Sequence, residues 1–326
     1  MKNILITSAG KRVVLVQIFQ QTLKDLGLEA KVYTTDMKPM MAPACIVSDE
    51  GIKVSPCNAE GYIDELIQIC QSRNVGVIIP TIDPELIVLA TNRQRFSDMG
   101  VEIVLSDEEF IKACRDKRQT QLYLKDVGID VPKAVDKYHP TFPLFVKPYD
   151  GSLSRDIHVV HNQRELTQEM LENPKFMFME YLDKQDYKEY SVDMYFGKDN
   201  RVKGIVPRER IEVRAGEINK GKTHKNEIVS FLNEKMGCLS GVRGCICFQL
   251  FYCESEHQIK GSEINPRFGG GFPLTYHAKA NYVEYIIREY LLNESVDYSE
   301  DWLDNTLMLR YDNNIIIYDG RYGRGL

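Results

Sequence analysis

The sequence lacks the patterns that identify several common classes of protein. No apolar run approaches the roughly 18 residues that span a bilayer, and the first apolar run is interrupted by Lys11 and Arg12, which is not typical of a secretory signal. The eight cysteines form no C-x-x-C pair, so we expect reduced and mostly buried thiols. Patterns of the H-x-x-x-H and G-x-S-x-G kind are missing, which argues against common zinc and serine-hydrolase sites. We therefore expect a cytoplasmic protein with no membrane partner.

A concentration of positive charge is also missing. The chain has 41 Lys and Arg against 47 Asp and Glu, a net charge of −6, and no block of it is strongly basic. Because phosphate backbones are bound by a concentrated positive face, we expect no nucleic-acid partner. Local basic clusters remain able to hold a small phosphorylated ligand. With 43% hydrophobic and 27% charged residues over 326 positions, the composition is that of a folded globular protein.

The first hundred residues alternate short apolar runs with amphipathic stretches. The predicted strands are residues 3–7, 29–36, 75–81 and 101–106, and the predicted helices are residues 13–27, 61–74 and 83–96. This alternation predicts parallel strands in an open α/β sheet. Asp83 and Pro84 are predicted as the N-cap and the first residue of their helix. Ser106 and Glu109 predict a capping box that opens one helix running to Gly128.

The remaining chain predicts two further units that are rich in strands. The first has strands at residues 142–151, 154–160 and 175–182 and a helix at residues 162–173. The second has strands at residues 190–197, 202–213, 244–254 and 258–267, followed by a helix from about Leu274 to Leu292. The fold class is therefore mixed, α/β at the N-terminus and α+β beyond it.

Three polar side chains alternate in the stretch from Gly261 to Gly271. They are Glu263, Asn265 and Arg267, and in an extended strand all three project from one face. If residues 247–265 form a hairpin, Gln249 shares that face. Such oxygen ligands suit a hard cation such as Mg²⁺, and an arginine beside them suits a phosphate or a reacting carboxyl group. The alternative is an ordinary antiparallel edge with its polar side toward water.

Two further segments suggest contacts to a nucleotide. Lys147 ends an apolar strand and precedes a loop of Gly, Ser and Asp, an arrangement that can hold phosphates. A plain hairpin is the alternative, because the loop has a single glycine. Glu180 and Glu189 lie at and beyond a strand end, where they can contact adenine and ribose. Both can equally be surface acids.

The order of these features resembles the ATP-grasp superfamily. A "DK" helix, a strand ending in Lys-Pro, a "MEYL" hinge, "KEYSV", Gln249 and "EINPR" follow one another as they do in that family. The resemblance is closest to the carbamoyl phosphate synthetase large-subunit branch, with a single ATP-grasp unit. It implies a Rossmann-like domain at residues 1–106 before a two-lobed ATP-grasp domain at residues 107–320. Within the latter, a lid subdomain would span about 125–182 and a catalytic subdomain about 183–310.

The resemblance also implies contacts for ATP. Two lysines would hold the phosphates, and two serines would replace backbone contacts of a loop that is often richer in glycine. The hinge would hold adenine through its backbone, and one acid would hold the ribose. The residues implied to bind the nucleotide are Lys117, Lys147, Ser152, Ser154, Glu180, Tyr181, Leu182 and Glu189.

For the metal and the chemistry, the resemblance implies four residues. Gln249, Glu263 and Asn265 would coordinate Mg²⁺, with Mn²⁺ as the other candidate, and Arg267 would face the reacting acyl group. Lys147 and Arg267 would be catalytic. The implied reaction transfers the γ-phosphoryl group of ATP to a carboxylate, and an amine then attacks the acyl phosphate. The partners are thus a small carboxylate and a small amine, and a homodimer is left open.

Three other functions are weighed against this ligase. One is a carbamoyl-phosphate-synthetase-like fragment that phosphorylates bicarbonate or carbamate. Another is a module that binds ATP without turnover, and the last is an NAD-dependent oxidoreductase, which the missing G-x-G-x-x-G argues against. For the acceptor pocket, the candidates are residues 8–12, Asp83, Arg208, Arg210, Arg214 and residues 269–271. The three arginines suggest an anionic substrate, or else surface ion pairs.

Overall fold

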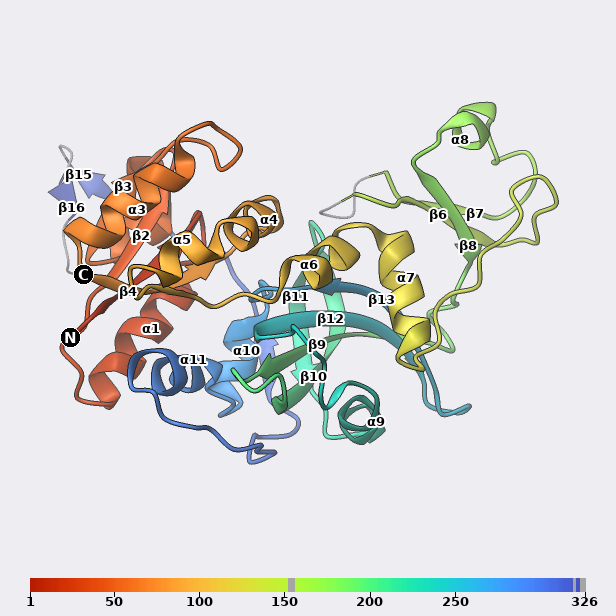
Figure 1. Cartoon of the computed structure of the whole chain (residues 1–326). Coiled ribbons are helices and arrows are strands. Elements are labelled where there is room, and N and C mark those ends of the chain that lie inside the picture. The colour runs from red at the N-terminus through yellow and green to blue at the C-terminus, as the bar shows by residue number, and fades with distance from the viewer. Residues whose placement is uncertain (152–155, 319–320, 323–326) are drawn as a thin grey trace.

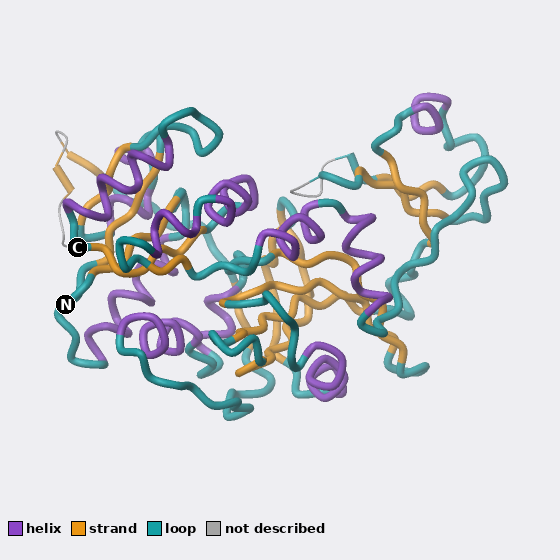
Figure 2. The backbone as a smooth tube through the Cα atoms, in the orientation of Figure 1, coloured by secondary structure: helices purple, strands orange, loops and turns teal. Residues whose placement is uncertain are grey.

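The computed structural model describes residues 1–151, 156–318 and 321–322 of the chain, with side chains given up to residue 318. The described strands form three main sheets that follow one another along the molecule (Figures 1 and 2). A short hairpin of β15 (Ile317–Tyr318) and β16 (Arg321–Tyr322) lies beside the N-terminal part (Figure 1). Among the described residues, no helix combines the length and the apolar character needed to cross a membrane.

The N-terminal part is a parallel five-stranded sheet in the order β3-β2-β1-β4-β5. Its elements are β1 (Asn3–Thr7), α1 (Val13–Asp25), β2 (Val32–Asp36), η1 (Pro39–Met41), α2 (Pro43–Val47), β3 (Glu50–Lys53), α3 (Tyr62–Ser72), β4 (Val75–Pro80), α4 (Asp83–Thr91), α5 (Arg93–Ser97) and β5 (Glu102–Ile103). Strand order reverses at β1, which pairs with β2 on one side and β4 on the other. In such sheets ligands bind at the carboxyl ends of the strands beside the reversal. Arg12 and Asp83 lie in the segments that follow β1 and β4.

A small lobe contains an antiparallel three-stranded sheet with the strand order β7-β6-β8. Its elements are β6 (Leu144–Pro148), β7 (His158–Val160), α8 (Gln168–Glu172) and β8 (Phe176–Glu180). The lobe has a small core of its own, built from Leu144, Val146, Val160, Leu166 and Phe178. In Figure 1 it projects away from the rest of the molecule.

The third part is a six-stranded antiparallel sheet in the order β13-β12-β9-β10-β11-β14. Its strands are β9 (Lys188–Phe196), β10 (Val202–Arg214), β11 (Glu217–Thr223), β12 (Gly244–Cys253), β13 (Gln258–Asn265) and β14 (Leu307–Leu309). The helical segments are α6 (Glu108–Arg115), α7 (Lys117–Asp126), α9 (Glu227–Met236), α10 (Phe272–His277), α11 (Tyr282–Ile286) and the π-helical turn η2 (Ile287–Leu291). Helix α7 packs against β13 and α9 against β10. The predicted fold class, a Rossmann-like sheet followed by two antiparallel lobes, is confirmed.

Several predicted boundaries are wrong. The helix predicted up to Gly128 is two helices, because Asp116 leaves the helical conformation and caps α7 by accepting a hydrogen bond from the Arg118 amide at 2.9 Å. The Ser106 capping box does not form, since the residue before α6 is Asp107 and the Ser106 hydroxyl contacts the Arg243 backbone instead.

Three more differences concern other elements. Asp83 is the first helical residue of α4 rather than its N-cap. The helix predicted between Leu274 and Leu292 is interrupted near Lys279, which has a positive φ of 77°. Strand β3 was not predicted, because Ile52 is the only one of its four residues with an apolar side chain.

One motif match is excluded by its structural context. Residues 216–223 read G-x-x-x-x-G-K-T, the spacing of a phosphate-binding P-loop. A P-loop requires a loop between a strand and a helix, with its amides free. Here the segment is strand β11, whose backbone pairs with β10 and β14. The match is therefore coincidental.

Candidate active site

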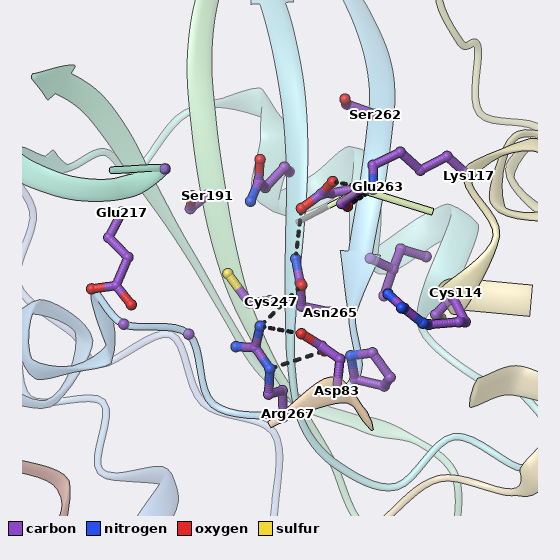
Figure 3. A pocket seen from close by; sticks show the side chains of 18 of the residues that line it. Asp83, Cys114, Lys117, Ser191, Glu217, Cys247, Ser262, Glu263, Asn265 and Arg267 are labelled. Carbon is purple, nitrogen blue, oxygen red and sulfur yellow. Dashed lines mark hydrogen bonds and ion pairs between the residues drawn. The ribbon is translucent and has the colours of Figure 1, made fainter. Parts of the chain in front are cut away.

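A cavity of 480 Å³ lies where the three parts of the chain meet. It is lined by segments that follow β1 and β4, by residues of β6 and by one face of the six-stranded sheet. Figure 3 shows Lys117 and Glu217 on opposite sides of this cavity, with Asn265 and Arg267 between them. The volume is within the range of sites for cofactors and drug-sized ligands, about 300–1,000 Å³.

The sheet contributes a row of polar side chains that crosses four strands. Glu263 on β13 pairs with Gln249 on β12, Gln249 with Ser191 on β9, and Ser191 with Arg208 on β10. Directly paired residues project from the same face, so all four side chains point toward the cavity. Residues two positions along share that face as well, which brings Asn265 into the same site.

The predicted metal ligands therefore lie together. The Asn265 amide donates a hydrogen bond from Nδ2 to Glu263 Oε1 at 3.0 Å, and its Oδ1 accepts one from Arg267 Nη2 at 3.2 Å. Burial raises the pKa of Glu263, but the ammonium groups of Lys117 and Lys147 outweigh burial and hold that pKa below its ordinary value. An ionised carboxylate beside two amide side chains fits a hard cation such as Mg²⁺. For Asn265 to contribute oxygen there, its amide would have to turn.

Two lysines flank Glu263. Lys117, the first residue of α7, places Nζ 3.4 Å from Glu263 Oε2 and donates a hydrogen bond to the Gly151 carbonyl at 2.6 Å. Lys147 reaches in from β6 and donates to the Ser262 hydroxyl at 3.3 Å. Only 8% of Lys147 is exposed, and this burial lowers its pKa to about 8. Because the helix is interrupted after α6, helix α7 begins at Lys117, and the side chain of this residue reaches the six-stranded sheet.

The other predicted nucleotide contacts are partly separated from this group. Glu189 lines the cavity and lies 2.9 Å from Arg210 Nε. Glu180 instead accepts from Lys260 Nζ at 2.5 Å and from the Lys133 amide at 2.9 Å. Among the described residues, Glu180, Tyr181 and Leu182 are not part of the cavity lining. Ser152 and Ser154 lie outside the described residues.

Arg267 joins the sheet to the N-terminal part. Its Nε and Nη2 donate to the two carboxylate oxygens of Asp83 at 2.9 and 2.7 Å. Such a two-point contact fixes the plane of the guanidinium. Nη1 donates to the Phe268 carbonyl at 3.1 Å. The guanidinium is therefore held next to Asn265 by a residue 184 positions away in the sequence.

The remaining predicted arginines have separate environments. Arg208 is buried and donates from Nη2 to Asp193 Oδ1 at 2.7 Å. Arg210 donates to the Ser191 hydroxyl at 3.0 Å. Arg214 is exposed and pairs with Asp312, so it is a surface ion pair. Only the first two line the cavity.

The cavity-lining residues that sequence reasoning missed include Ser191, Cys247 and Glu217. Ser191 lies directly opposite Gln249, and Cys247 directly opposite Asn265. Both follow from the alternation on their strands once the register is known, but the sequence does not give the register. Glu217 follows a turn and shows no distinguishing pattern.

Two family models match the chain. Residues 4–104 match the model described as PylC-like, N-terminal domain, and residues 172–309 match that described as ATP-grasp in the biosynthetic pathway with Ter operon. The chain belongs to the ATP-grasp superfamily. Its assignment to the carbamoyl phosphate synthetase branch stays a prediction. No curated protein matches the sequence.

Solved structures share the fold of this ATP-grasp chain. The biotin carboxylase domain of Hydrogenobacter thermophilus 2-oxoglutarate carboxylase, in complex with MgADP and bicarbonate, has a TM-score of 0.68 and 15% identity over 94% of this chain and 73% of that one. Staphylococcus aureus N5-carboxyaminoimidazole synthetase with ADP has a TM-score of 0.69 and 18% identity, covering 95% and 81%. Bacillus licheniformis L-amino acid ligase has a TM-score of 0.65 and 17% identity, covering 89% and 74%.

Proposed function

We propose that this chain is an ATP-dependent, ADP-forming carbon–nitrogen ligase that activates a carboxylate as an acyl phosphate and couples it to an amine. The observation that carries this proposal is the grouping of Glu263, Gln249 and Asn265 with two lysines on one side and Arg267 on the other. The solved relatives that bind ADP and that are named as a synthetase or an amino-acid ligase support it.

The side chains divide the work between binding and charge stabilisation. Lys117 and Lys147 place positive charge where triphosphate oxygens would lie, in a buried site where charge interactions are strong. Glu263, Gln249 and Asn265 would hold Mg²⁺, which when bound neutralises charge on the phosphates. The phosphoryl transition state is loose, so positioned cations contribute most of the catalysis.

Arg267 stabilises the acceptor. Asp83 holds the guanidinium of Arg267 in one plane. There the positive charge can stabilise the carboxylate that attacks the γ-phosphorus. The bond from γ-phosphorus to the bridging oxygen breaks and ADP leaves. The amine then attacks the acyl carbon, loses a proton and displaces phosphate. The products are ADP, phosphate and an amide.

The comparisons do not favour the alternatives of a carbamoyl-phosphate-synthetase-like fragment or a non-catalytic module. The domain limits stay as proposed, at residues 1–106 and 107–320, with the lid at about 125–182 and the catalytic subdomain at about 183–310. Glu180, Tyr181 and Leu182 are proposed to hold adenine, and Glu189 the ribose. A rise in the Kd of ADP on Glu180→Ala would support this assignment.

We also propose an oligomeric state and a cellular location for the chain. The Hydrogenobacter relative is a domain dimer, which supports a homodimer here. Light scattering should give the mass of two chains, and the mass of one chain would contradict this. The eight free thiols support a cytoplasmic location, which cell fractionation would test.

The deciding experiment removes the Glu263 carboxylate. Glu263→Ala should lower ADP release in the presence of a carboxylate and an amine by more than about 100-fold, while nucleotide binding is weakened less. The control is Glu254→Ala, an exposed acid on the turn of the same hairpin. Near-normal turnover of Glu263→Ala under saturating Mg²⁺ would contradict the proposal. Release of AMP and pyrophosphate would contradict the mechanism.

A further inference from the structure

The part of the cavity beyond Arg267 has a charge balance of its own. We call it the distal end and define it by Arg12, Arg208, Glu217 and residues 269–271, all of which line the cavity. In Figure 3 Glu217 marks this end, opposite Lys117. Glu217 at this end is paired with Arg310 at 2.7 Å, and Asp83 beside it is paired with Arg267. Each of these acids already has an arginine as its counter-charge.

Arg12 is a cation at the distal end that has no paired acid among the described residues. Its guanidinium forms no ion pair or hydrogen bond within the described part of the chain, although it lies among Arg267, Glu217 and Asp83. Burial, followed by the neighbouring charge of Arg267, lowers its pKa below the ordinary value. Arg12 also precedes the first turn of the 13-residue helix α1, which has no capping side chain and no acid in its first turn. An anion beside Arg12 would therefore relieve an unbalanced positive charge.

Arg208 supplies a second set of unused donors. The residue is 1% exposed, and its Nε and Nη1 have no hydrogen-bond partner, while Nη2 is fixed by Asp193. Unpaired buried donors of this kind are rare in folded proteins and call for a partner. Arg208 lines the cavity, and Gly271 lies so close to Nη1 that a side chain at position 271 would collide with it.

We propose that the distal end binds a carboxylate that does not react, carried by one of the two substrates, through Arg12 and Arg208. This inference rests on the proposed function, in which Arg267 faces the carboxylate that does react. It names the substrate class as an amino acid, whose amine is the nucleophile, or a dicarboxylic acid, one of whose groups is activated. A single surplus positive charge suits one carboxylate and not a phosphate dianion.

The test uses the full chain with MgATP and a panel of amino acids and dicarboxylic acids, each compared with its mono-amide. Wild type should show a KM for the acid roughly 10- to 100-fold below that for the amide, with kcat less affected. If the amino acid binds better than its amide, the amine substrate carries the carboxylate that does not react. If the dicarboxylic acid binds better than its amide, the activated substrate carries it. Calorimetric binding of the same panel to the chain loaded with MgADP gives a readout that does not depend on turnover.

Two variants localise the effect. Arg12→Gln should raise the KM of the acid by the same factor and leave that of the amide unchanged. Gly271→Ala should do the same, because the added methyl group clashes with Arg208 Nη1 and forces the guanidinium to move. Lys24→Gln, which removes an exposed charge at the other end of α1, is the control.

Two results would overturn the inference: a wild type that does not distinguish acid from amide in binding or KM, or an Arg12→Gln variant that distinguishes them as well as wild type. Failure of the ligase function is recognised separately, by turnover that survives Glu263→Ala.

Discussion

The ammonium of Lys147 combines burial with a position beside the proposed phosphate site. Burial lowers its pKa to about 8 from an ordinary value of 10.5. Between these values the lysine is neutral in the folded chain and charged in the unfolded chain. The folded state then binds fewer protons, so this group's contribution to stability rises with pH across that window. Its contribution to phosphate binding changes in the opposite direction.

We therefore expect nucleotide affinity to fall as pH rises through about 8. Bound phosphates favour the charged lysine, so the Kd of MgADP should increase by up to about tenfold per pH unit above that point. Calorimetric titrations from about pH 7 to about pH 9.5 measure this dependence. Lys147→Met should bind more weakly and lose the dependence in this range. A wild-type Kd that stays constant up to about pH 9.5 would contradict the expectation.

The proximity of individual residues was predictable only where local pattern decides it. Glu263, Asn265 and Arg267 lie at alternate positions, and the strand period alone brings the first two to one face. A hairpin predicts that Gln249 shares this face, and the register that the sequence leaves open pairs it with Glu263. Glu180 shows the limit: its carboxylate is held by Lys260, a contact between residues 80 positions apart that no local pattern contains.

At the level of elements, the sequence patterns predict apolar strands such as β1 more accurately than they predict where a helix is interrupted. Strand β1 is fully described by its apolar run, whereas α6 and α7 read as one amphipathic stretch. The break at Asp116 depends on tertiary packing, because α6 packs mainly against α4 and less against β13, while α7 packs against β13. Helix propensity is a weak preference that such packing overrides.

Strands β9 and β10 are joined by the buried pair of Asp193 and Arg208. Asp193 is fully buried and also accepts from the Thr275 hydroxyl at 2.6 Å. Arg208→Met should therefore destabilise the chain by roughly 3–5 kcal/mol, because it leaves a buried carboxylate without its partner. Urea unfolding followed by circular dichroism measures this loss.

A double variant separates lost charge pairing from lost packing. Adding Asp193→Leu to Arg208→Met should restore most of the stability, since two apolar side chains of suitable volume can replace a buried ion pair. If the single variant costs less than about 1 kcal/mol, the pair does not stabilise the sheet in this way.

At the scale of the whole molecule, the N-terminal part and the six-stranded sheet share one core. Phe19 of α1 packs edge-to-face on Phe268 at 6.3 Å between ring centroids, and both belong to a continuous apolar cluster. The small lobe has its own core. The sequence suggested separate units but could not show which of them share a core, because the contacting faces are far apart in the chain.

Asp83 links that shared arrangement to the chemistry. It comes from the N-terminal part and orients Arg267 through two hydrogen bonds. Asp83→Asn keeps the size of the side chain but removes the charge and one acceptor. We expect kcat for ADP release to fall by about 10- to 100-fold, as for other partners that orient a functional group, while the Kd of MgADP changes less than about twofold.

Asp107→Asn is the matched control, because Asp107 forms a comparable ion pair with Arg243 at 2.6 Å, and neither residue lines the cavity. That variant should retain kcat. Steady-state kinetics with the carboxylate and amine that support turnover, together with calorimetry for MgADP, measure both quantities. Equal losses of kcat in the two variants would mean that Asp83 acts by general stabilisation of the domain contact. A loss confined to Asp83→Asn would mean that the N-terminal part positions Arg267 for catalysis, and so that the site is complete only when the two parts are packed together.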